Sequence, residues 1–415
     1  MYLIYSILYF LALLFLFPFE YLKRPKELRK RWIRERFGFF HASPITHHSS
    51  RIWIHAVSVG EVIASVPLVK KIKDRYPSAE IVVSTVTDTG QKVANERMGD
   101  IARIIYVPFD LPFMIRNTVK NIRPSLFIIM ETELWPNIIR ILSRLGVPVL
   151  LMNGRISEKS FSGYKKLRFF IKDVLKNMSL FCMQNELYAN RIKALGAEHD
   201  KVRITGSFKF DTRPSSSAPE WTKILQGPVI IAGSTHRTEE DLIIDAYIKL
   251  KTDFPELNLI VAPRHPERFK EVEELVRKKR LEYVKRSDVT GHGSRVTGVV
   301  ILLDAIGELA SAYGACDVAI MGGSFIEHGG QNPLEPAYWG KAIVCGPHME
   351  NFPFIDEFYK SGAALKADAD SLHKSLKELL ADHERMASMG KKARELYKKN
   401  AGAVEKAMGE IEKFL

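Results

Sequence analysis

The chain has 415 residues, of which 46% are hydrophobic and 26% are charged, the composition of a folded globular protein. This length exceeds what one hydrophobic core normally organises, so we expect two domains. A formal net charge of +13 predicts an anionic partner, either nucleic acid, an anionic membrane surface or a phosphorylated substrate. The three cysteines lie far apart in apolar contexts, and their odd number argues against a disulfide framework and favours a reducing compartment.

The first segment of the chain is strongly apolar. Residues 1–19 contain no charged side chain. As a helix they would extend roughly 28 Å, close to the ~30 Å hydrocarbon core of a bilayer. A cleaved signal peptide is excluded, because there is neither a basic start nor a small-residue cleavage site. We therefore predict a transmembrane anchor over residues 1–20, and the alternative is a hydrophobic helix packed on a partner.

Residues 21–50 follow as a basic juxtamembrane segment and linker. Basic side chains dominate its first half, namely Lys23, Arg24, Lys26, Arg29, Lys30, Arg31, Arg34 and Arg36. This is the positive-inside pattern, so the rest of the chain is expected in the cytoplasm. Apolar residues recur at helical spacing from Leu28 to Phe37, which predicts an interfacial helix on the anionic leaflet. The Ser and His residues around 41–50 indicate a short linker.

From 51 to 208, apolar strand-like runs alternate with helical patterns, which predicts a doubly wound parallel sheet covered on both faces. The first strand, 52–57, leads through Ser58 and Gly60 directly into a helix. Glu61 is the one carboxylate at this junction, where parallel strands open onto a crevice. Its structural alternative is a capping role in the first helical turn.

Two further loops of this domain carry polar side chains at the carboxyl ends of strands. One contains Glu131 and Glu133, and the other contains Asn153 and Arg155. Open α/β sheets bind ligands at this edge, so both loops are candidates for a site. The alternative for the two acids is a stabilising position in a first helical turn. Acids at i and i+2 do not share a helical face, so we expect only one to point into the crevice.

A Pro- and Ser-rich linker at 209–227 separates this domain from a second strand–helix alternation over 228–400. A C-terminal amphipathic helix at 401–415 is expected to be packing surface. The most specific loop of the second domain runs from 322 to 336. Its paired glycines allow close backbone approach to a ligand.

That loop ends in Asn-Pro at a predicted helix start. Asn332 is expected as the N-cap and Pro333 as the first helical residue, which makes a phosphate-binding helix terminus. Glu335, one turn further on, could accept hydrogen bonds from ribose hydroxyls. A glycine-rich turn with purely structural caps is the alternative.

Several common motifs are absent. No G-x-G-x-x-G follows a strand, and there is no P-loop, nucleophile elbow or metal-ligand cluster. We therefore expect no metal and no cofactor. The charge on a leaving phosphate would be met by Arg, Lys and a helix N-terminus.

Five ordered motifs carry a resemblance to a known family. They are His-Ala-Val-Ser-Val-Gly-Glu at 55–61, Met-Glu-Thr-Glu-Leu-Trp-Pro at 130–136, Gly-Ser-Phe-Lys-Phe-Asp at 206–211, Pro-Arg-His-Pro-Glu-Arg-Phe at 263–269, and Gly-Gly followed by Asn-Pro-Leu-Glu-Pro between 322 and 336. They closely resemble 3-deoxy-D-manno-octulosonic acid (Kdo) transferases, and the resemblance covers nearly the whole chain. It implies the GT-B fold, with two Rossmann-like doubly wound domains facing a cleft and an N-terminal membrane helix.

The resemblance also implies an activity. The family transfers Kdo, with inversion, from CMP-Kdo to the lipid A precursor (lipid IVA) at the inner membrane. The implied partners are therefore CMP-Kdo, the lipid A precursor and the anionic inner-membrane surface, with no nucleic acid. A single-pass anchor would place the catalytic domains in the cytoplasm.

Carried over by position, Glu61 corresponds to the family's general base, and Glu131 and Lys209 correspond to groups that stabilise the transition state. The implied CMP site comprises Pro263, Arg264, Ile306, Gly307, Glu308, Asn332, Pro333, Leu334 and Glu335. The sequence departs from the family pattern at Ile306, His328 and Gln331, where Met, Arg and His are common. A tension remains at Glu61, because a helix N-terminus stabilises a carboxylate and so lowers its basicity.

Two other functions fit parts of the sequence. A non-hydrolysing nucleotide-sugar epimerase has the same two-domain architecture, but it would not need residues 1–19 or the basic segment behind them. A basic nucleic-acid-binding protein would explain the net charge. Part of that charge belongs to the juxtamembrane segment, however, and no recognised nucleic-acid module is present.

Overall fold

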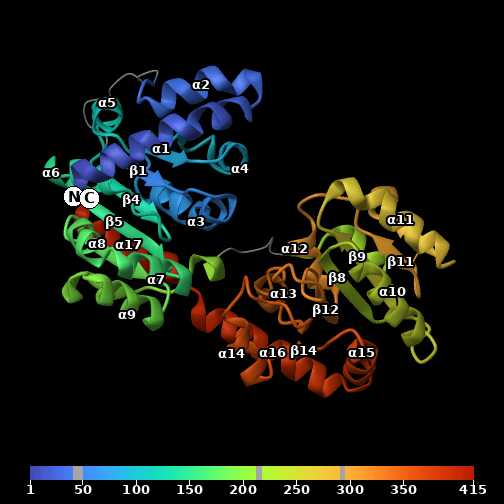
Figure 1. Cartoon of the computed structure of the whole chain (residues 1–415). Coiled ribbons are helices and arrows are strands. Elements are labelled where there is room, and N and C mark those ends of the chain that lie inside the picture. The colour runs from blue at the N-terminus through green and yellow to red at the C-terminus, as the bar shows by residue number, and fades with distance from the viewer. Residues whose placement is uncertain (41–49, 212–216, 290–294) are drawn as a thin grey trace. The chain divides into compact units, whose positions relative to one another are not determined.

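The computed structural model describes residues 1–40, 50–211, 217–289 and 295–415. The linker expected at 41–50 lies outside the described residues except for Ser50, and so do residues 212–216 of the linker expected at 209–227. The chain forms two compact units (Figure 1). Unit 1 comprises Met1–Thr212 and Ala401–Leu415, and unit 2 comprises Arg213–Asn400.

Unit 1 contains a seven-stranded sheet in the order β3-β2-β1-β4-β5-β6-β7, and every pairing is parallel. The predicted doubly wound sheet is confirmed. Its strands are β1 (Arg51–His55), β2 (Glu80–Thr85), β3 (Arg103–Tyr106), β4 (Leu126–Met130), β5 (Val149–Gly154), β6 (Leu180–Met183) and β7 (Val202–Ile204). Its helices are α3 (Val59–Arg75), α4 (Asp88–Met98), α5 (Pro112–Ile122), α6 (Pro136–Arg144), α7 (Glu158–Lys166), α8 (Arg168–Leu175) and α9 (Glu186–Leu195).

The central strands are buried along their whole length because helices cover both faces of the sheet. Every residue of β1, β4 and β5 is buried. Trp53 lies beside Val82 on one side and Phe127 on the other, and the two aromatic ring centroids are 4.6 Å apart. Helices α7 and α8 are separated at Leu167, where the backbone leaves helical geometry.

The C-terminal helix α17 (Ala403–Ile411) returns to unit 1 and packs its apolar face there, as its amphipathic pattern predicts. The start of α17 is held by Asp211, the last residue of a short 3₁₀ helix, η2 (Phe208–Asp211). Asp211 accepts hydrogen bonds from the backbone N–H groups of Gly402 and Val404. This carboxylate satisfies the otherwise unpaired amides of the helix N-terminus.

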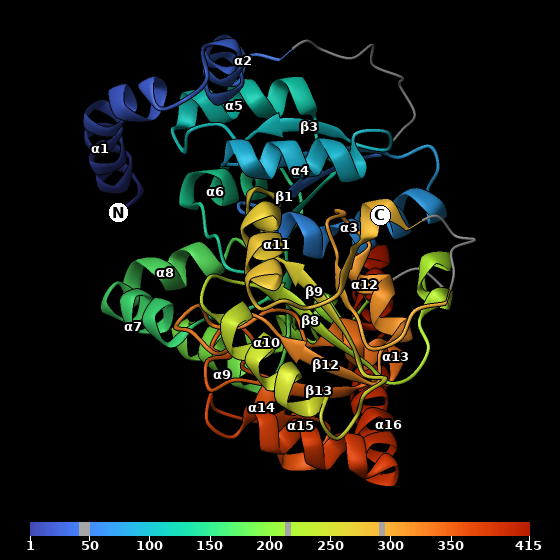
Figure 2. The same cartoon turned by 90° about the vertical axis from the view of Figure 1, so that its right-hand side faces the viewer.

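Unit 2 repeats the architecture with a second parallel seven-stranded sheet, in the order β10-β11-β9-β8-β12-β13-β14. Figure 2 labels four of its strands, β8, β9, β12 and β13. Its strands are β8 (Val229–Thr235), β9 (Asn258–Pro263), β10 (Tyr283–Lys285), β11 (Val300–Leu302), β12 (Val318–Met321), β13 (Ala342–Cys345) and β14 (Leu365–Lys366). Its helices are α10 (Glu239–Leu250), α11 (Phe269–Lys278), α12 (Leu309–Ala312), α13 (Leu334–Trp339), α14 (Ile355–Ser361), α15 (Leu372–Ala381) and α16 (His383–Asn400). Helix α12 is only four residues long and continues as a 3₁₀ turn, and Gly307 just before it has a left-handed φ of +88°.

Each sheet has a central position where the strand order reverses direction. In unit 1 it lies between β1 and β4, and in unit 2 between β8 and β12. Ligands of open α/β sheets bind outside the carboxyl ends of the strands at such switch points. We therefore expect the ligand-binding and catalytic residues in the loops that follow these four strands.

Two helices precede the first sheet, α1 (Tyr2–Leu22) and α2 (Lys26–Arg36). By length and composition α1 is apolar enough to cross a membrane, as predicted for residues 1–20. In the structure α1 packs on unit 1 through one of its faces (Figure 1).

Candidate active site

The switch point of unit 1 brings together the acids that the sequence predicts for the site. Glu61 lies in the first turn of α3, directly after β1, and Glu131 directly follows β4. Glu131 and Glu133 both lie close enough to Glu61 to raise the pKa of its carboxyl group. The segment between β4 and α6 is not helical, so the helical-face argument does not apply to these two acids. Which of them points into the crevice stays a prediction.

Glu61 makes the contacts of a capping residue. It is 9% exposed, and its Oε2 accepts a hydrogen bond from Val57 N at 2.8 Å. Ser58 donates its hydroxyl to Glu61 Oε1 at 3.2 Å, and Ser58 Oγ accepts from Glu61 N at 3.4 Å. This is the reciprocal arrangement of a capping box, shifted by one residue on the acid's side. The hydrogen bonds of Glu61 are therefore those of the capping role that was the alternative prediction for it.

The electrostatics of Glu61 resolve the tension noted in its sequence context. Burial raises the pKa of Glu61 to about 7, and the neighbouring Glu131 and Glu133 add to the rise. The hydrogen bonds from Val57 and Ser58 lower it, but by less. A general base works best when its pKa lies near the working pH, so this carboxylate is suited to accept a proton at neutral pH.

Glu131 and Lys209 form an oppositely charged pair beside Glu61. Glu131 has a left-handed φ of 58°, a conformation that costs a non-glycine residue of order 1–3 kcal/mol and that clusters at functional sites. Burial raises the pKa of Glu131, while the charges of Lys209 and Arg155 oppose the rise. Burial also lowers the pKa of Lys209, and Glu131 opposes that change. Each group therefore helps to keep the other charged.

Asn153 holds the turn that carries Lys209, a role that the sequence did not reveal. It is fully buried with a left-handed φ of 55° at the end of β5. Its Oδ1 accepts a hydrogen bond from Phe208 N at 3.1 Å, and its carbonyl accepts from Gln184 Nε2 at 3.0 Å. The first of these bonds holds the start of the 3₁₀ turn that carries Lys209. The sequence feature that could have indicated this role is a polar Asn directly after the apolar run 149–152.

In unit 2, the glycine loop after β12 is held by a buried carboxylate, that of Glu239. Glu239 accepts hydrogen bonds from Gly323 N at 2.7 Å, Phe325 N at 3.0 Å and His236 N at 2.9 Å. It thus ties the ends of β8 and β12 together at the switch point. Gly323 has a φ of +64°, and a Cβ there would lie 3.2 Å from the His328 ring.

The predicted donor residues Asn332 and Glu335 lie together at the end of this loop. Asn332 Oδ1 accepts from Leu334 N at 3.2 Å, but the prediction of Asn332 as the N-cap is wrong, because Pro333 takes that position. Helix α13 starts at Leu334, however, so Pro333 precedes it, and its six residues make only a short dipole. Asn332 Nδ2 donates to Glu335 Oε1 at 3.5 Å. Burial raises the pKa of Glu335 to about 7, opposed by Asn332 and Arg264.

The remaining predicted donor residues lie at the carboxyl ends of β9 and β11. Pro263 ends β9 and is buried, and the adjacent Arg264 is exposed. Ile306 exposes 81% of its surface, which leaves an apolar side chain free to pack on a planar base. Glu308 accepts from Trp221 Nε1 at 2.7 Å and pairs with Arg286 Nε at 2.8 Å. Because its carboxylate already has these partners, Glu308 would meet a ligand through its backbone.

A cluster of histidines at the switch point of unit 2 was not predicted. The ring centroids of His236 and His328 lie 4.0 Å apart, and those of His236 and His265 lie 5.7 Å apart. Gln331 Nε2 lies 3.1 Å from His236 Nε2. Burial lowers the pKa of His236 to about 4, with His328 and His265 adding to the effect. Two of the sequence's departures from the family pattern, at His328 and Gln331, both fall in this cluster.

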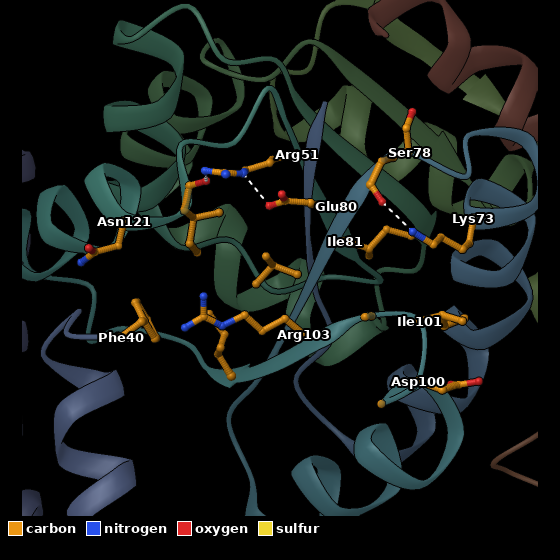
Figure 3. A pocket seen from close by; sticks show the side chains of 16 residues that line it. Phe40, Arg51, Lys73, Ser78, Glu80, Ile81, Asp100, Ile101, Arg103 and Asn121 are labelled. Atoms are coloured by element: carbon orange, nitrogen blue, oxygen red, sulfur yellow. Dashed lines mark hydrogen bonds and ion pairs between the residues drawn. The ribbon is translucent and has the colours of Figure 1, made fainter. Parts of the chain in front are cut away.

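Unit 1 also contains a cavity of about 380 Å³, but it lies at the opposite edge of the sheet (Figure 3). Arg51, Glu80 and Arg103 line it at the amino ends of β1, β2 and β3. Arg51 Nε pairs with Glu80 Oε2 at 2.7 Å, and Lys73 Nζ donates to the Ala79 carbonyl at 3.0 Å. These charged groups are thus engaged in an ion pair and a hydrogen bond within the protein. The cavity is lined by none of the predicted site residues.

Replacing Glu335 with alanine should weaken the binding of CMP, the ligand that the family resemblance implies for this loop. A hydrogen bond to a charged group is worth about 1.5–3 kcal/mol, or roughly tenfold or more in affinity. Calorimetry at pH 8, above the Glu335 pKa of about 7, should show this loss. Glu327→Ala, an exposed acid of the same loop, is the matched control and should bind CMP like the parent. Unchanged affinity in Glu335→Ala would exclude Glu335 from the site.

Comparison with known proteins relates both units of the chain to glycosyltransferases. A family described as "3-Deoxy-D-manno-octulosonic-acid transferase (kdotransferase)" matches residues 31–212, and "Glycosyl transferases group 1" matches residues 232–396. The 3-deoxy-D-manno-octulosonic acid transferase of Haemophilus influenzae is 34% identical over 392 residues, which cover 92% of this chain and 91% of the relative.

Solved structures share the architecture at low sequence identity. MurG from Acinetobacter baumannii superposes with a TM-score of 0.54 at 14% identity, covering 88% of this chain and 100% of MurG. A UDP-N-acetylglucosamine 2-epimerase superposes with a TM-score of 0.57 at 12% identity, covering 88% and 96%. The fold is therefore GT-B-like, and by itself it does not separate a transferase from an epimerase. The family is shown instead by the sequence identity to the H. influenzae protein over nearly the full length. The chain belongs to the 3-deoxy-D-manno-octulosonic acid transferase family.

Proposed function

We propose that this protein is an inverting, metal-independent glycosyltransferase that moves Kdo from CMP-Kdo to the lipid A precursor, lipid IVA, in lipopolysaccharide biosynthesis. Family membership supports the reaction class. The observation that carries the chemistry is Glu61, a buried carboxylate with a pKa of about 7 at the switch point of unit 1. Neither a purely structural cap nor a nucleic-acid-binding surface requires such a group.

In the proposed reaction Glu61 accepts the proton of an acceptor hydroxyl while that oxygen attacks the anomeric carbon of Kdo. The bond between this carbon and the phosphate oxygen of CMP breaks, and CMP leaves with the electron pair. Lys209, held charged by Glu131, stabilises negative charge near the reacting atoms. In unit 2, Arg264, Asn332 and Glu335 bind CMP, and the backbone of residues 306–308 lines the same site.

The direct test is mass spectrometry of the lipid product. Purified protein, CMP-Kdo and lipid IVA should yield lipid whose mass rises by whole Kdo units, and the spectrum counts them. The alternative, a nucleotide-sugar epimerase, predicts an isomerised nucleotide sugar and an unchanged lipid. That result would reject the proposal.

Transfer should proceed in EDTA at nearly the rate measured with magnesium. Among the described residues there is no group of three or more His, Cys, Asp or Glu arranged to hold a metal ion. Leaving-group charge would then be stabilised by cationic side chains and backbone amides. Activity that disappears in EDTA and returns with a divalent ion would contradict this account.

We further propose that the protein works at the cytoplasmic face of the inner membrane, anchored through α1. The apolar length of α1 and the basic residues of α2 support this location. The same basic excess would serve the anionic membrane surface and the anionic substrates, with no role for nucleic acid.

A further inference from the structure

The N-terminal half of α1 is bound to unit 1 by polar contacts. Tyr5 donates its hydroxyl to Asp110 Oδ2 at 2.8 Å. Ser6 Oγ accepts from Asn137 Nδ2 at 3.0 Å, and the Tyr2 hydroxyl accepts from Asn177 Nδ2 at 3.2 Å. A helix facing only hydrocarbon has no use for these polar side chains.

Aromatic rings continue the same contact from the middle of α1 toward its C-terminal end. Tyr9 lies against Trp135 with ring centroids 6.5 Å apart, and Phe17 lies against Trp32 at 5.7 Å. The Arg29 guanidinium lies over the ring of Tyr21, near the helix end, at 5.0 Å. The contacts thus extend from the first turn to the last, and α1 lies lengthwise along unit 1 (Figures 1 and 2).

This packing is difficult to reconcile with a helix that crosses the bilayer. Asp110 is fully buried and also accepts from the backbone N–H groups of Asn137 at 3.0 Å and Ile138 at 2.9 Å. A spanning α1 would be surrounded by ~30 Å of hydrocarbon. It would then either leave unit 1, which removes a partner from the buried Asp110, or carry these polar groups into lipid, which is strongly unfavourable.

The opposite face of α1 is apolar and exposed. Its large exposed side chains are Leu3, Ile4, Ile7, Leu8, Phe10, Leu11, Leu14, Phe15, Leu16, Phe19 and Leu22. A contiguous apolar surface of this extent on a water-soluble protein marks an interaction site.

Basic side chains stand at both ends of this apolar face. At the C-terminal end are exposed lysines of α2 and the segment before it, Lys23, Lys26 and Lys30. At the N-terminal end is α8, whose Phe170 packs on Tyr2. Exposed basic residues, Lys165, Lys166, Arg168 and Lys172, surround the exposed Leu167 and Phe169 there. Cationic groups at both ends of an apolar face match an anionic bilayer surface, and they would repel a second copy of the chain.

We propose that α1 is a monotopic helix, which lies in the plane of the anionic membrane surface with one face on unit 1 and the other in the acyl region. Leu167 and Phe169 insert beside it. The chain therefore does not cross the bilayer, and Met1 stays on the same side as the catalytic units. The inference rests on the proposed membrane location and is independent of the transferase reaction.

A protease-protection experiment tests the topology. The full-length protein carries a cleavable tag before Met1 or after Leu415 and is examined in sealed inner-membrane vesicles with the cytoplasmic face outward. Added protease should remove both tags without detergent. An N-terminal tag that is protected until detergent is added, while the C-terminal tag is cleaved, would show a spanning helix and overturn the proposal.

Disulfide trapping in the same vesicles tests the packing. The pair Ser6→Cys and Asn137→Cys should crosslink, because the native side chains are in contact. The matched pair Ile7→Cys and Asn137→Cys should not, because Ile7 lies on the exposed face. The three native cysteines are buried and provide a low background. Absence of the first crosslink in vesicles, with the protein still retaining its Kdo transfer, would overturn the proposed packing.

Discussion

Glu61→Gln should transfer Kdo roughly 10²–10⁴-fold more slowly than the parent, the usual contribution of a positioned general base. Glutamine keeps the shape of the side chain. Its oxygen can still accept from Val57 N, and its amide can donate to Ser58 Oγ, but it cannot take a proton. CMP affinity should stay within about twofold, because the predicted CMP residues all belong to unit 2.

The pH dependence adds a second readout for the same group. The charged carboxylate is the base, so kcat/KM of the parent should fall about tenfold per pH unit below the Glu61 pKa of about 7 and level off above it. The pKa is raised from the usual 4.5, so the folded state binds this proton more tightly than the unfolded state does. The stabilisation is therefore complete below about 4.5 and is lost as pH rises through about 7. Glu61→Gln should lack this loss and be no less stable than the parent at pH 8.

Glu186→Gln is the matched control for a first-turn acid. Glu186 begins α9 directly after β6, in the same unit, but it is exposed. Its replacement should leave both transfer rate and melting temperature near those of the parent. If Glu61→Gln also transfers Kdo within a few-fold of the parent, Glu61 is a cap and not the base.

Lys209→Met should lower kcat by roughly 10²–10³-fold, the typical loss when one preorganised electrostatic group is removed. Methionine keeps most of the buried apolar stem. Glu131 would lose the cation that lowers its pKa, so it should bind a proton at a higher pH than in the parent. The pH–rate profile of Lys209→Met should therefore change shape as well as height.

A double-mutant cycle with Glu131→Gln checks that the two groups act as a unit. The combined loss should be clearly smaller than the product of the two single losses. Lys70→Met, at an exposed position of α3, is the control and should have full activity. Losses that multiply independently would show that Glu131 and Lys209 act separately.

The sequence by itself determined the two parallel sheets and the edge at which their chemistry lies. Strand and helix periodicities are local properties, and β1 and β4 read as continuous apolar runs because both of their faces are covered. Polar residues directly after such strands, Glu61 and Glu131 among them, could therefore be assigned to a ligand-binding edge. The apolar length of α1 was also evident from composition alone.

Other properties of the molecule depend on groups that are distant in the sequence. The helix terminus alone predicted a weak base at Glu61, but tertiary burial and the approach of Glu131 raise its pKa instead. The histidine cluster joins His236 to His328 across two strands, and Asn153 reaches the turn that carries Lys209. The sequence showed that α1 is apolar. Only its contacts with Asp110 and Asn137 show that one face of α1 packs on unit 1. Burial and Coulomb interactions depend on distances in space, which local sequence patterns do not contain.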